Sequence, residues 1–488
     1  MQRIEFGLAR QVSFAFLFAA TIVAVPGLSD AAQEDAAPAA ATNATALATP
    51  THHQTGLIKA NVAGMPDRSL KCFCLTPDNR IVAGCAGGAG ELRVFDEAGE
   101  FVESWAAPFE PEAIYVRADG KIFLAGAGKL ARLSSTGEVE LERPAPHAES
   151  MGENLEKIRA DVIEQRKQQA EMFVSQAKQY DEMIERTEKQ AADLEKQLAD
   201  LGEVGDAGQK KQLEQQLAMQ RQMKQQYEQV KKQWDEMVAR QKPKELTESE
   251  IDELVEQSIQ YKRQASSISA TEGEVFLTTH ASVGYGFDVW KMDADFAGGR
   301  TIITGLSGCC GQMDVKASGD GLFVAENSKH RVCRYNGDGE LICNWGHGAR
   351  KGIEGFGSCC NPMNVAFGPE GAVYTAEDNT GRIKRYSPDG NLLGLVGSVD
   401  LVPGCKNCSI AVNSDGSRVY MLDITRGHIV RMEPFKPGEA PAPAAVEDEE
   451  AVEEDPLQQS ASYRVDVIET DVGGTVAKGV MKLLGYGD

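Results

Sequence analysis

Short runs of alternating apolar and polar residues, separated by glycine- and aspartate-containing turns, recur along most of the chain. Two copies are clear, because CGQMDVKASGDG from Cys310 and CNPMNVAFGPEG from Cys360 align without a gap. In each copy an apolar run ending in Ala-Glu follows, then a turn, an alternating strand and a Gly-Asp-Gly or Pro-Asp-Gly turn. Weaker copies begin near Ser69, Glu110, Ser269 and Cys408. Units of roughly 40–50 residues holding four short strands are typical of propeller blades.

This repeat predicts an all-β six-bladed β-propeller, because one blade cannot bury both of its faces alone and must stack against neighbours. The propeller is expected in two parts, residues 55–146 and 266–436. The last unit supplies only three strands before proline-rich sequence begins. We expect the strand-like segment Gly56–Gly64 to complete that blade and close the ring; the alternative is an independent N-terminal strand.

One stretch of the repeat carries a family resemblance. NVAFGPEGAVYTAED from Asn364, followed by RIKRYSPDG from Arg382, resembles an NHL-type repeat and is similar to the six-bladed SMP-30-like sugar-lactonase propellers. The resemblance is strongest over residues 310–435 and weaker over 69–146. It implies the fold more than an activity, since propellers host many functions.

Residues 147–265 interrupt the repeat and are rich in Gln, Glu, Lys and Met. Apolar or small residues recur there at steps of four and three, the spacing of a coiled coil. The first stripe is Ala177, Tyr180, Ile184, Thr187, Ala191, Leu194, Leu198 and Leu201, and the second is Met223, Tyr227, Val230, Trp234 and Met237. Glycines from Gly202 to Gly208 separate the stripes, which predicts an inserted α-helical antiparallel coiled-coil hairpin.

A third helix is expected to follow the hairpin. Pro243 ends the second helix, and Thr247-Glu-Ser-Glu250 has the pattern of a capping box that opens another helix through about Arg263. We expect this arm to bind a protein partner or a second copy of the chain. The alternative is an inert insertion in a loop between blades.

The two ends differ in composition from the repeat. An apolar run from Val12 to Val25 follows Arg3 and Arg10, which predicts a signal peptide over residues 1–31 and a periplasmic or secreted protein. The alternative is an uncleaved membrane anchor, the one membrane contact expected. Residues 32–54 are expected to form a flexible linker, 437–459 an acidic Pro/Ala-rich linker, and 460–488 an ordered C-terminal segment.

Charge restricts the class of partner. The 488 residues include 73 Asp and Glu against 50 Lys and Arg, a net charge of −23. Nucleic-acid binding requires a basic surface that displaces counterions, and acidic residues are interleaved with the lysines of the arm. We therefore expect no nucleic-acid partner.

The repeat also predicts where the cysteines lie. Nine of them fall on innermost strands, just before them, or where a second strand ends, so we expect them near one mouth of the channel: Cys72, Cys74, Cys85, Cys309, Cys310, Cys359, Cys360, Cys405 and Cys408. Thiolates at such a mouth bind soft metals, here copper or zinc. An iron–sulfur cluster is less favoured, because the signal lacks a twin-arginine pair. Cross-blade disulfides and a redox-active thiol set that includes Cys405–Cys408 are the alternatives.

Cys333 and Cys343 form a separate pair. They lie on two strands joined at Asn336–Glu340, and folding about Asp338 places them directly opposite each other. This predicts a cross-strand disulfide, with two buried thiols as the alternative.

Carboxylates offer a second candidate site. Glu326, Glu377 and Asp423 fall where second strands end, and Asn364 lies on an innermost strand. The resemblance to lactonase-like propellers implies that such residues hold Ca²⁺ or Mg²⁺ for ester hydrolysis; the alternative is an ordinary role in turns and blades. The favoured function is an exported binding or assembly module. A metal-dependent lactonase-like hydrolase and a thiol redox protein are the alternatives, so enzymatic activity stays open.

Overall fold

The computed structural model describes residues 47–202, 206–241, 246–309, 311–319, 321–349, 352–358, 360–402, 404, 406–436 and 438–439. The predicted signal peptide, the acidic linker and the C-terminal segment lie outside these residues, except for a few positions of the acidic linker. No helix among the described residues is long and apolar enough to cross a membrane.

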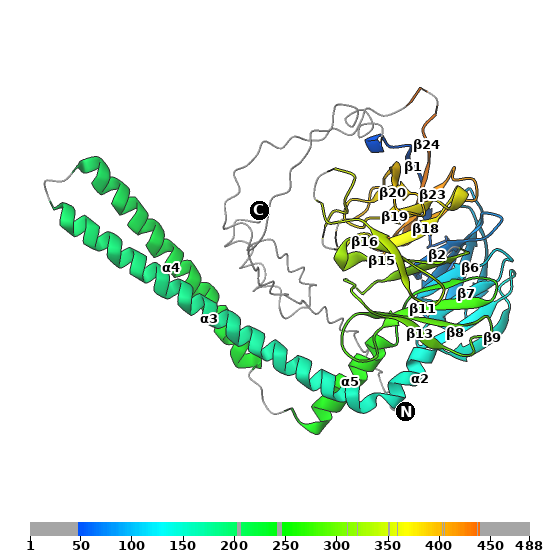
Figure 1. Cartoon of the computed structure of the whole chain (residues 1–488), viewed down its shortest axis with the longest axis horizontal. Helices are drawn as coiled ribbons and strands as arrows, with labels where there is room; N and C mark the ends of the chain where they lie inside the picture. The colour runs from blue at the N-terminus through cyan, green and yellow to red at the C-terminus, as the bar shows by residue number, and fades with distance from the viewer. Residues whose placement is uncertain are drawn as a thin grey trace. The chain divides into compact units, whose positions relative to one another are not determined.

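Among the described residues, six four-stranded antiparallel sheets are present, and they fit a six-bladed β-propeller (Figure 1). We number the blades by the order of their innermost strands. Blades one and two contain β2 (Ser69–Leu75), β3 (Ile81–Ala86), β4 (Glu91–Phe95), β5 (Phe101–Ala106), β6 (Ala113–Val116), β7 (Ile122–Gly126), β8 (Lys129–Leu133) and β9 (Val139–Pro144). Blades three and four contain β10 (Ala265–Ala270), β11 (Glu274–His280), β12 (Phe287–Asp293), β13 (Arg300–Leu306), β14 (Asp314–Ser318), β15 (Gly321–Glu326), β16 (Arg331–Tyr335) and β17 (Leu341–Trp345). Blades five and six contain β18 (Asn364–Phe367), β19 (Val373–Ala376), β20 (Arg382–Tyr386), β21 (Leu392–Ser398), β22 (Ile410–Val412), β23 (Val419–Asp423), β24 (His428–Pro434) and β1 (His52–Lys59).

Burial follows the position of a strand within its blade. All six residues of β3 are buried, whereas β5 at the outer edge of the same blade is mostly exposed. Successive innermost strands contact one another, and β22 contacts β2. The apolar cores lie between neighbouring blades, because alternate residues of each strand face opposite neighbours.

The N-terminal strand completes the sixth blade, as predicted. β1 pairs with β24 in antiparallel register, with Leu57 opposite Val430. The strand is His52–Lys59 rather than Gly56–Gly64, so it begins inside the segment expected to be a linker. The strand begins earlier than expected because the backbone of His52–Gln54 pairs with β24. The side chains of these residues show no strand pattern in the sequence.

The described part of the insertion between blades two and three contains four helices. They are α2 (Pro146–Glu153), α3 (Leu155–Leu201), α4 (Ala207–Gln241) and α5 (Glu248–Lys262). The chain enters the insertion through two helices, α2 and α3, which meet at Asn154. The capping box of α5 is confirmed, since the Glu250 amide donates to Thr247 Oγ1 and the Thr247 amide donates to Glu250 Oε2.

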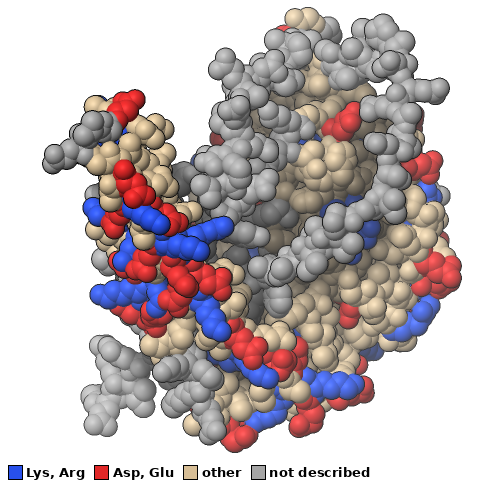
Figure 2. Space-filling view, turned by 60° about the vertical axis from the view of Figure 1, so that its left-hand side comes forward, with Lys and Arg blue, Asp and Glu red and all other residues tan. Residues whose placement is uncertain are grey.

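The long helices α3 and α4 pack side by side as a helical hairpin (Figure 1). Their predicted stripes meet: the Tyr180 and Tyr227 ring centroids are 6.4 Å apart, and Trp234 packs against Phe173 at 5.8 Å. Ion pairs cross between the helices beside this seam, as between Lys224 and Glu188. Figure 2 shows basic and acidic side chains interleaved on the surface, without a continuous basic face on the side in view.

Candidate functional site

Three loops that precede innermost strands bring cysteines together at blades four to six. Cys309 precedes β14, Cys360 precedes β18 and Cys408 precedes β22. All three belong to one apolar cluster, in which Cys360 and Cys408 are buried and Cys309 is partly buried. The Sγ atoms of Cys309 and Cys360 lie 3.2 Å apart, longer than the disulfide bond length of about 2.05 Å. The other predicted members of this group, Cys310, Cys359 and Cys405, lie outside the described residues.

Buried side-chain amides hold the backbones of these loops. Asn327 accepts a hydrogen bond from the Cys309 amide at 2.8 Å and donates to the Gln312 carbonyl at 2.8 Å. Asn361 donates to the Gly357 carbonyl at 2.8 Å. Both asparagines are fully buried. Since a buried amide that loses its partner is costly, these bonds fix the path of the loops that carry the sulfur atoms.

A thioether adds to the sulfur atoms of this region. Met363 is fully buried in the same apolar cluster as the three cysteines. Its Sδ accepts a hydrogen bond of 3.4 Å from Asn327 Nδ2, the amide that also holds the Cys309 loop. Sequence reasoning missed Met363, Gln312 and Asn361. The one available signal was the gapless repeat alignment, which places Met313 and Met363 at equivalent positions.

Electrostatics at the site disfavour the charged form of the Cys408 thiol. Burial raises the pKa of the Cys408 thiol well above its ordinary value, and the carboxylates of Asp378 and Asp314 raise it further. Asp314 is buried as well, and its Oδ2 accepts a hydrogen bond from the Val365 amide at 2.8 Å. A reactive CxxC cysteine has a lowered pKa, so Cys408 lacks that property.

The cysteines of blade one lie elsewhere, against the expectation of a single mouth. Cys72 packs in the core between blades one and two, with Cys74 against it, whereas Cys85 packs in the core between blades six and one. Strand alternation explains the difference, because Cys72 and Cys74 share one face of β2 and Cys85 lies on the opposite face of the blade. Burial raises the pKa of Cys85 to about 11.

The predicted pairing of Cys333 with Cys343 is wrong. In the register of β16 and β17, Cys333 lies opposite Asn344 and Cys343 lies opposite Arg334. A bulge between Arg334 and Tyr335 shifts the register, so simple folding about the turn misplaces the partners. Both cysteines are thiols in the structure, Cys333 buried and Cys343 partly exposed.

The four candidate oxygen ligands each have protein partners of their own. Glu326 accepts from Arg331 Nε at 2.6 Å, and Glu377 accepts from Arg382 Nε at 2.7 Å. Further bonds run from the Thr425 amide to Asp423 at 3.1 Å and from the Ile410 amide to Asn364 at 3.0 Å. Among the residues that the structure describes, no group of three or more His, Cys, Asp or Glu side chains could hold a metal ion.

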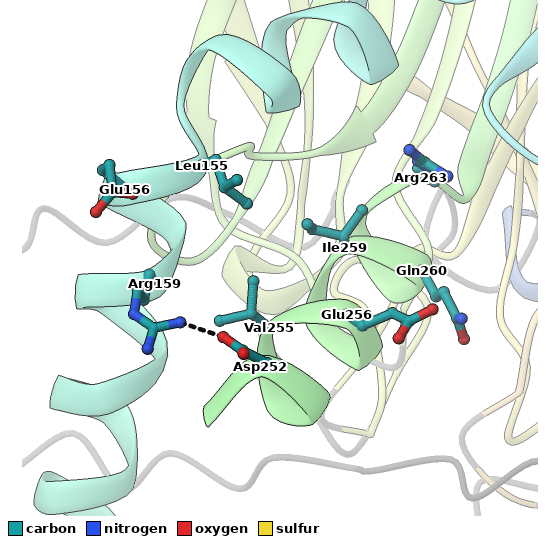
Figure 3. A pocket seen from close by; sticks show the side chains of 9 residues that line it. All are labelled: Leu155, Glu156, Arg159, Asp252, Val255, Glu256, Ile259, Gln260 and Arg263. Atoms are coloured by element: carbon teal, nitrogen blue, oxygen red, sulfur yellow. Dashed lines mark hydrogen bonds and ion pairs between the residues drawn. The ribbon is translucent and has the colours of Figure 1, made fainter. Parts of the chain in front are cut away.

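A hollow of about 330 Å³ lies at the root of the arm, between α3 and α5 (Figure 3). Leu155, Val255 and Ile259 give it an apolar side, and Arg159 pairs with Asp252 at its edge. None of the predicted site residues lines it. The hollow therefore belongs to the joint of the arm and is separate from the sulfur atoms.

Comparison with known proteins finds similar solved structures only. No family model matches the chain, and no curated protein matches it. Similar solved structures include virginiamycin B lyase from Staphylococcus aureus, with a TM-score of 0.38 and 9% identity over 76% of this chain and 83% of that chain. A calcium-binding regucalcin from Agrobacterium tumefaciens has a TM-score of 0.39 and 14% identity over 80% and 97%. The WD40 β-propeller domain of Doa1 has a TM-score of 0.37 and 7% identity over 79% and 98%. These likenesses carry no statement about activity.

Proposed function

We propose that this protein is an exported β-propeller that works as a binding and assembly module, with a helical arm that binds a protein partner or a second copy of the chain. The predicted signal peptide supports a periplasmic or secreted location. The observation that carries the proposal is the construction of the joint between the arm and the propeller. We call the contacts of α3 and α5 with each other and with the loop between β11 and β12 the joint. Buried polar hydrogen bonds hold it, and an insertion without a function would not require them.

The joint combines an apolar core with a buried ammonium group. Ile158 and Val162 of α3 pack with Ile251 and Val255 of α5. Lys262, at the end of α5, is buried and donates to the carbonyls of Ala281 at 2.8 Å and Gly284 at 2.7 Å. These contacts tie the helices to the loop between β11 and β12.

Two further contacts fasten α3. The Gly284 amide donates to Asp161 Oδ2 at 3.0 Å. Arg159 forms an ion pair with Asp252 of α5, which Figure 3 shows, and a second one with Glu248 of the same helix. The 47 residues of α3 span about 70 Å at the helical rise per residue. A helix of this length on a fixed base presents a long surface for a partner.

The test compares the full chain with an arm-shortened variant that lacks residues 177–230, a deletion that removes facing parts of α3 and α4 and leaves the joint. Sedimentation and cross-linking measure self-association, and purification from the exported compartment measures a stable partner. We expect the complex to be lost on shortening. Equal assembly by both proteins would overturn the role of the arm, and thermal unfolding checks that the propeller is intact.

For the propeller itself we propose a soft metal ion, copper or zinc, at the sulfur atoms of blades four to six. The 3.2 Å approach of the Cys309 and Cys360 sulfur atoms supports this over a carboxylate site, because thiolate and thioether ligands select soft ions. Copper(I) suits the set best, since it needs only about two or three soft ligands and accepts thioethers such as Met363. Cross-blade disulfides are the alternative for the same cysteines.

Elemental analysis of protein purified without chelators decides between these uses. We expect about one copper or zinc ion per chain in the wild type and its loss in Cys360→Ser. Calcium or magnesium alone, with lactone hydrolysis that is lost in Glu377→Ala, would instead support the hydrolase. No metal, together with a reversible thiol titration, would support the redox protein.

A further inference from the structure

One side of α3, separate from its seam with α4, carries apolar side chains that are open to solvent. Ile163 is 40% exposed and Val174 is 46% exposed. Each directly follows a residue that packs inward, since Val162 belongs to the core of the joint and Phe173 packs on Trp234. Successive residues of a helix lie about 100° apart around its axis. Ile163 and Val174 therefore lie on a side of α3 that neither contact covers.

These residues belong to a stripe with the spacing of a coiled coil. Lys167 and Ala170 lie between Ile163 and Val174, so the successive steps are four, three and four residues. Lys167 is exposed and Ala170 is partly buried. We call these four residues the outer stripe. A helix face with this spacing can pack against a second helix, and the small Ala170 lets the two backbones approach closely.

The spacing of the outer stripe is the same when it is followed in either direction along the helix. A second α3 that runs antiparallel, with its Val174 opposite Ile163, therefore meets every position of the stripe. Val174 then lies opposite Ile163 of the second copy, and each Lys167 lies opposite an Ala170. The result is two apolar layers, with room for the lysine side chains over the alanines between them.

Charge favours this antiparallel arrangement over a parallel one. Glu171 follows Ala170, so in the antiparallel pair Lys167 lies beside Glu171 of the second copy. In a parallel pair the two Lys167 side chains would lie opposite each other, and like charges repel. Lys167 and Glu171 are both exposed, and the ion pairs between α3 and α4 in the described part of the chain use other residues. Both charges can therefore pair with a second copy.

We propose that the arm binds a second copy of this chain through the outer stripe, as an antiparallel pair of α3 helices with a two-fold axis between Lys167 and Ala170. The same patch serves both copies, so the contact closes at a dimer. This inference rests on the proposed role of the arm, and it names the partner and the surface. The arm-shortened variant is expected to be monomeric for the same reason: Gln176 is joined to Lys231, so the chain must reverse there and Val174 leaves the helix.

The experiment measures the dissociation constant of the dimer by sedimentation of the full chain over a concentration series. Ile163→Glu and Val174→Lys should each weaken the dimer by about tenfold or more, because either change buries a charge in both apolar layers. An equimolar mixture of the two variants should dimerise again. The antiparallel heterodimer keeps one Ile163–Val174 layer and places the new carboxylate opposite the new ammonium group in the other.

Met219→Glu is the matched control, because Met219 is 54% exposed on α4 and lies outside the outer stripe. Its dissociation constant should equal that of the wild type. Circular dichroism checks that the hairpin is folded in all three variants. Recovery in the mixture is specific to antiparallel pairing, because a parallel pair would place the two positions 163 opposite each other.

A wild-type chain that stays monomeric throughout the series would overturn this inference. The proposed role of the arm would still stand if another protein co-purifies with the full chain and is lost from the arm-shortened variant, and it would fall as well if no partner is lost. A dimer that neither Ile163→Glu nor Val174→Lys weakens would overturn the outer stripe while leaving self-association in place. Two weakened variants whose mixture stays weak would overturn the antiparallel pairing.

Discussion

The side-chain amide of Gln312 forms two hydrogen bonds with the backbone of Cys408. Gln312 Nε2 donates to the Cys408 carbonyl at 2.7 Å, and the Cys408 amide donates to Gln312 Oε1 at 2.9 Å. Gln312 precedes the innermost strand of blade four and Cys408 that of blade six, so the pair bridges loops of non-adjacent blades. The Gln312 side chain thus forms the pair of hydrogen bonds with the Cys408 backbone that a residue of a neighbouring strand would form.

Gln312→Ala is expected to destabilise the protein by about 2–3 kcal/mol, because it leaves a buried amide and a buried carbonyl of Cys408 without partners. The free energy of unfolding in urea measures this loss. Gln257→Ala, at an exposed position of α5, is the control and should stay within about 0.5 kcal/mol of the wild type. Equal stabilities of the two variants would contradict a structural role for the bridge.

This bridge shows which parts of the molecule the sequence could predict. The blades and the hairpin follow from local patterns, since period-two alternation specifies strands and the seven-residue spacing specifies the helical seam. The capping box at Thr247 is equally local. Gln312 bonds instead to the backbone of Cys408 in another blade, and Asn327 bonds to the loop that precedes β14. No periodicity marks a residue whose partner is a backbone group of a loop.

The cysteines also separate what the sequence could predict from what it could not. Cys309 and Cys360 lie one position apart in the repeat alignment, in the loops that precede the innermost strands of adjacent blades, and their sulfur atoms are close together. The repeat fails for Cys72 and Cys85, where the face on which a side chain lies depends on strand phase, and for Cys333, where a single bulge changes the register. One extra residue is invisible to pattern matching yet decides the pairing.

The closing strand offers a test with a matched control. Ile58 and Leu57 are adjacent on β1, but Ile58 is 3% exposed in the core between blades six and one, whereas Leu57 is 48% exposed. Ile58→Ala should lower the free energy of unfolding by about 2–4 kcal/mol. Leu57→Ala should change it by less than about 0.5 kcal/mol. Chemical denaturation of both proteins makes the comparison, and similar losses would mean that β1 does not pack on blade one.

The hairpin has its own test at Trp234. Its ring packs on Phe173 of the facing helix, so Trp234→Ala should weaken local pairing by about 1–2 kcal/mol and speed amide exchange in α3 and α4 by about 5–30-fold. Exchange in the blades should not change. Met219→Ala, 54% exposed on α4, is the control. Faster exchange throughout the propeller would show that the helices and blades unfold as one unit.

The buried side chain of Lys384 makes the free energy of unfolding depend on pH in the alkaline range. Its ammonium group is fully buried over the Phe356 ring at 4.0 Å, donates to the Gly355 carbonyl at 2.7 Å and lies 3.2 Å from Glu377 Oε1. Burial lowers the pKa of Lys384 to about 8 despite the raising effect of Glu377. The unfolded chain, with an ordinary lysine pKa of about 10.4, therefore binds more protons than the folded chain between these two values.

Stability must then rise with pH across that window, because the free energy of unfolding increases wherever the unfolded state binds more protons. The contribution of Lys384 is expected to grow by about 2–3 kcal/mol between pH 8 and pH 10.5. In Lys384→Met, which keeps an apolar chain over Phe356 and leaves Glu377 paired with Arg382, this part of the slope should vanish. Urea unfolding of both proteins at a series of pH values measures the difference. Lys129→Met, at an exposed position, should keep the wild-type slope; if Lys384→Met keeps it too, the buried ammonium is not the group that titrates.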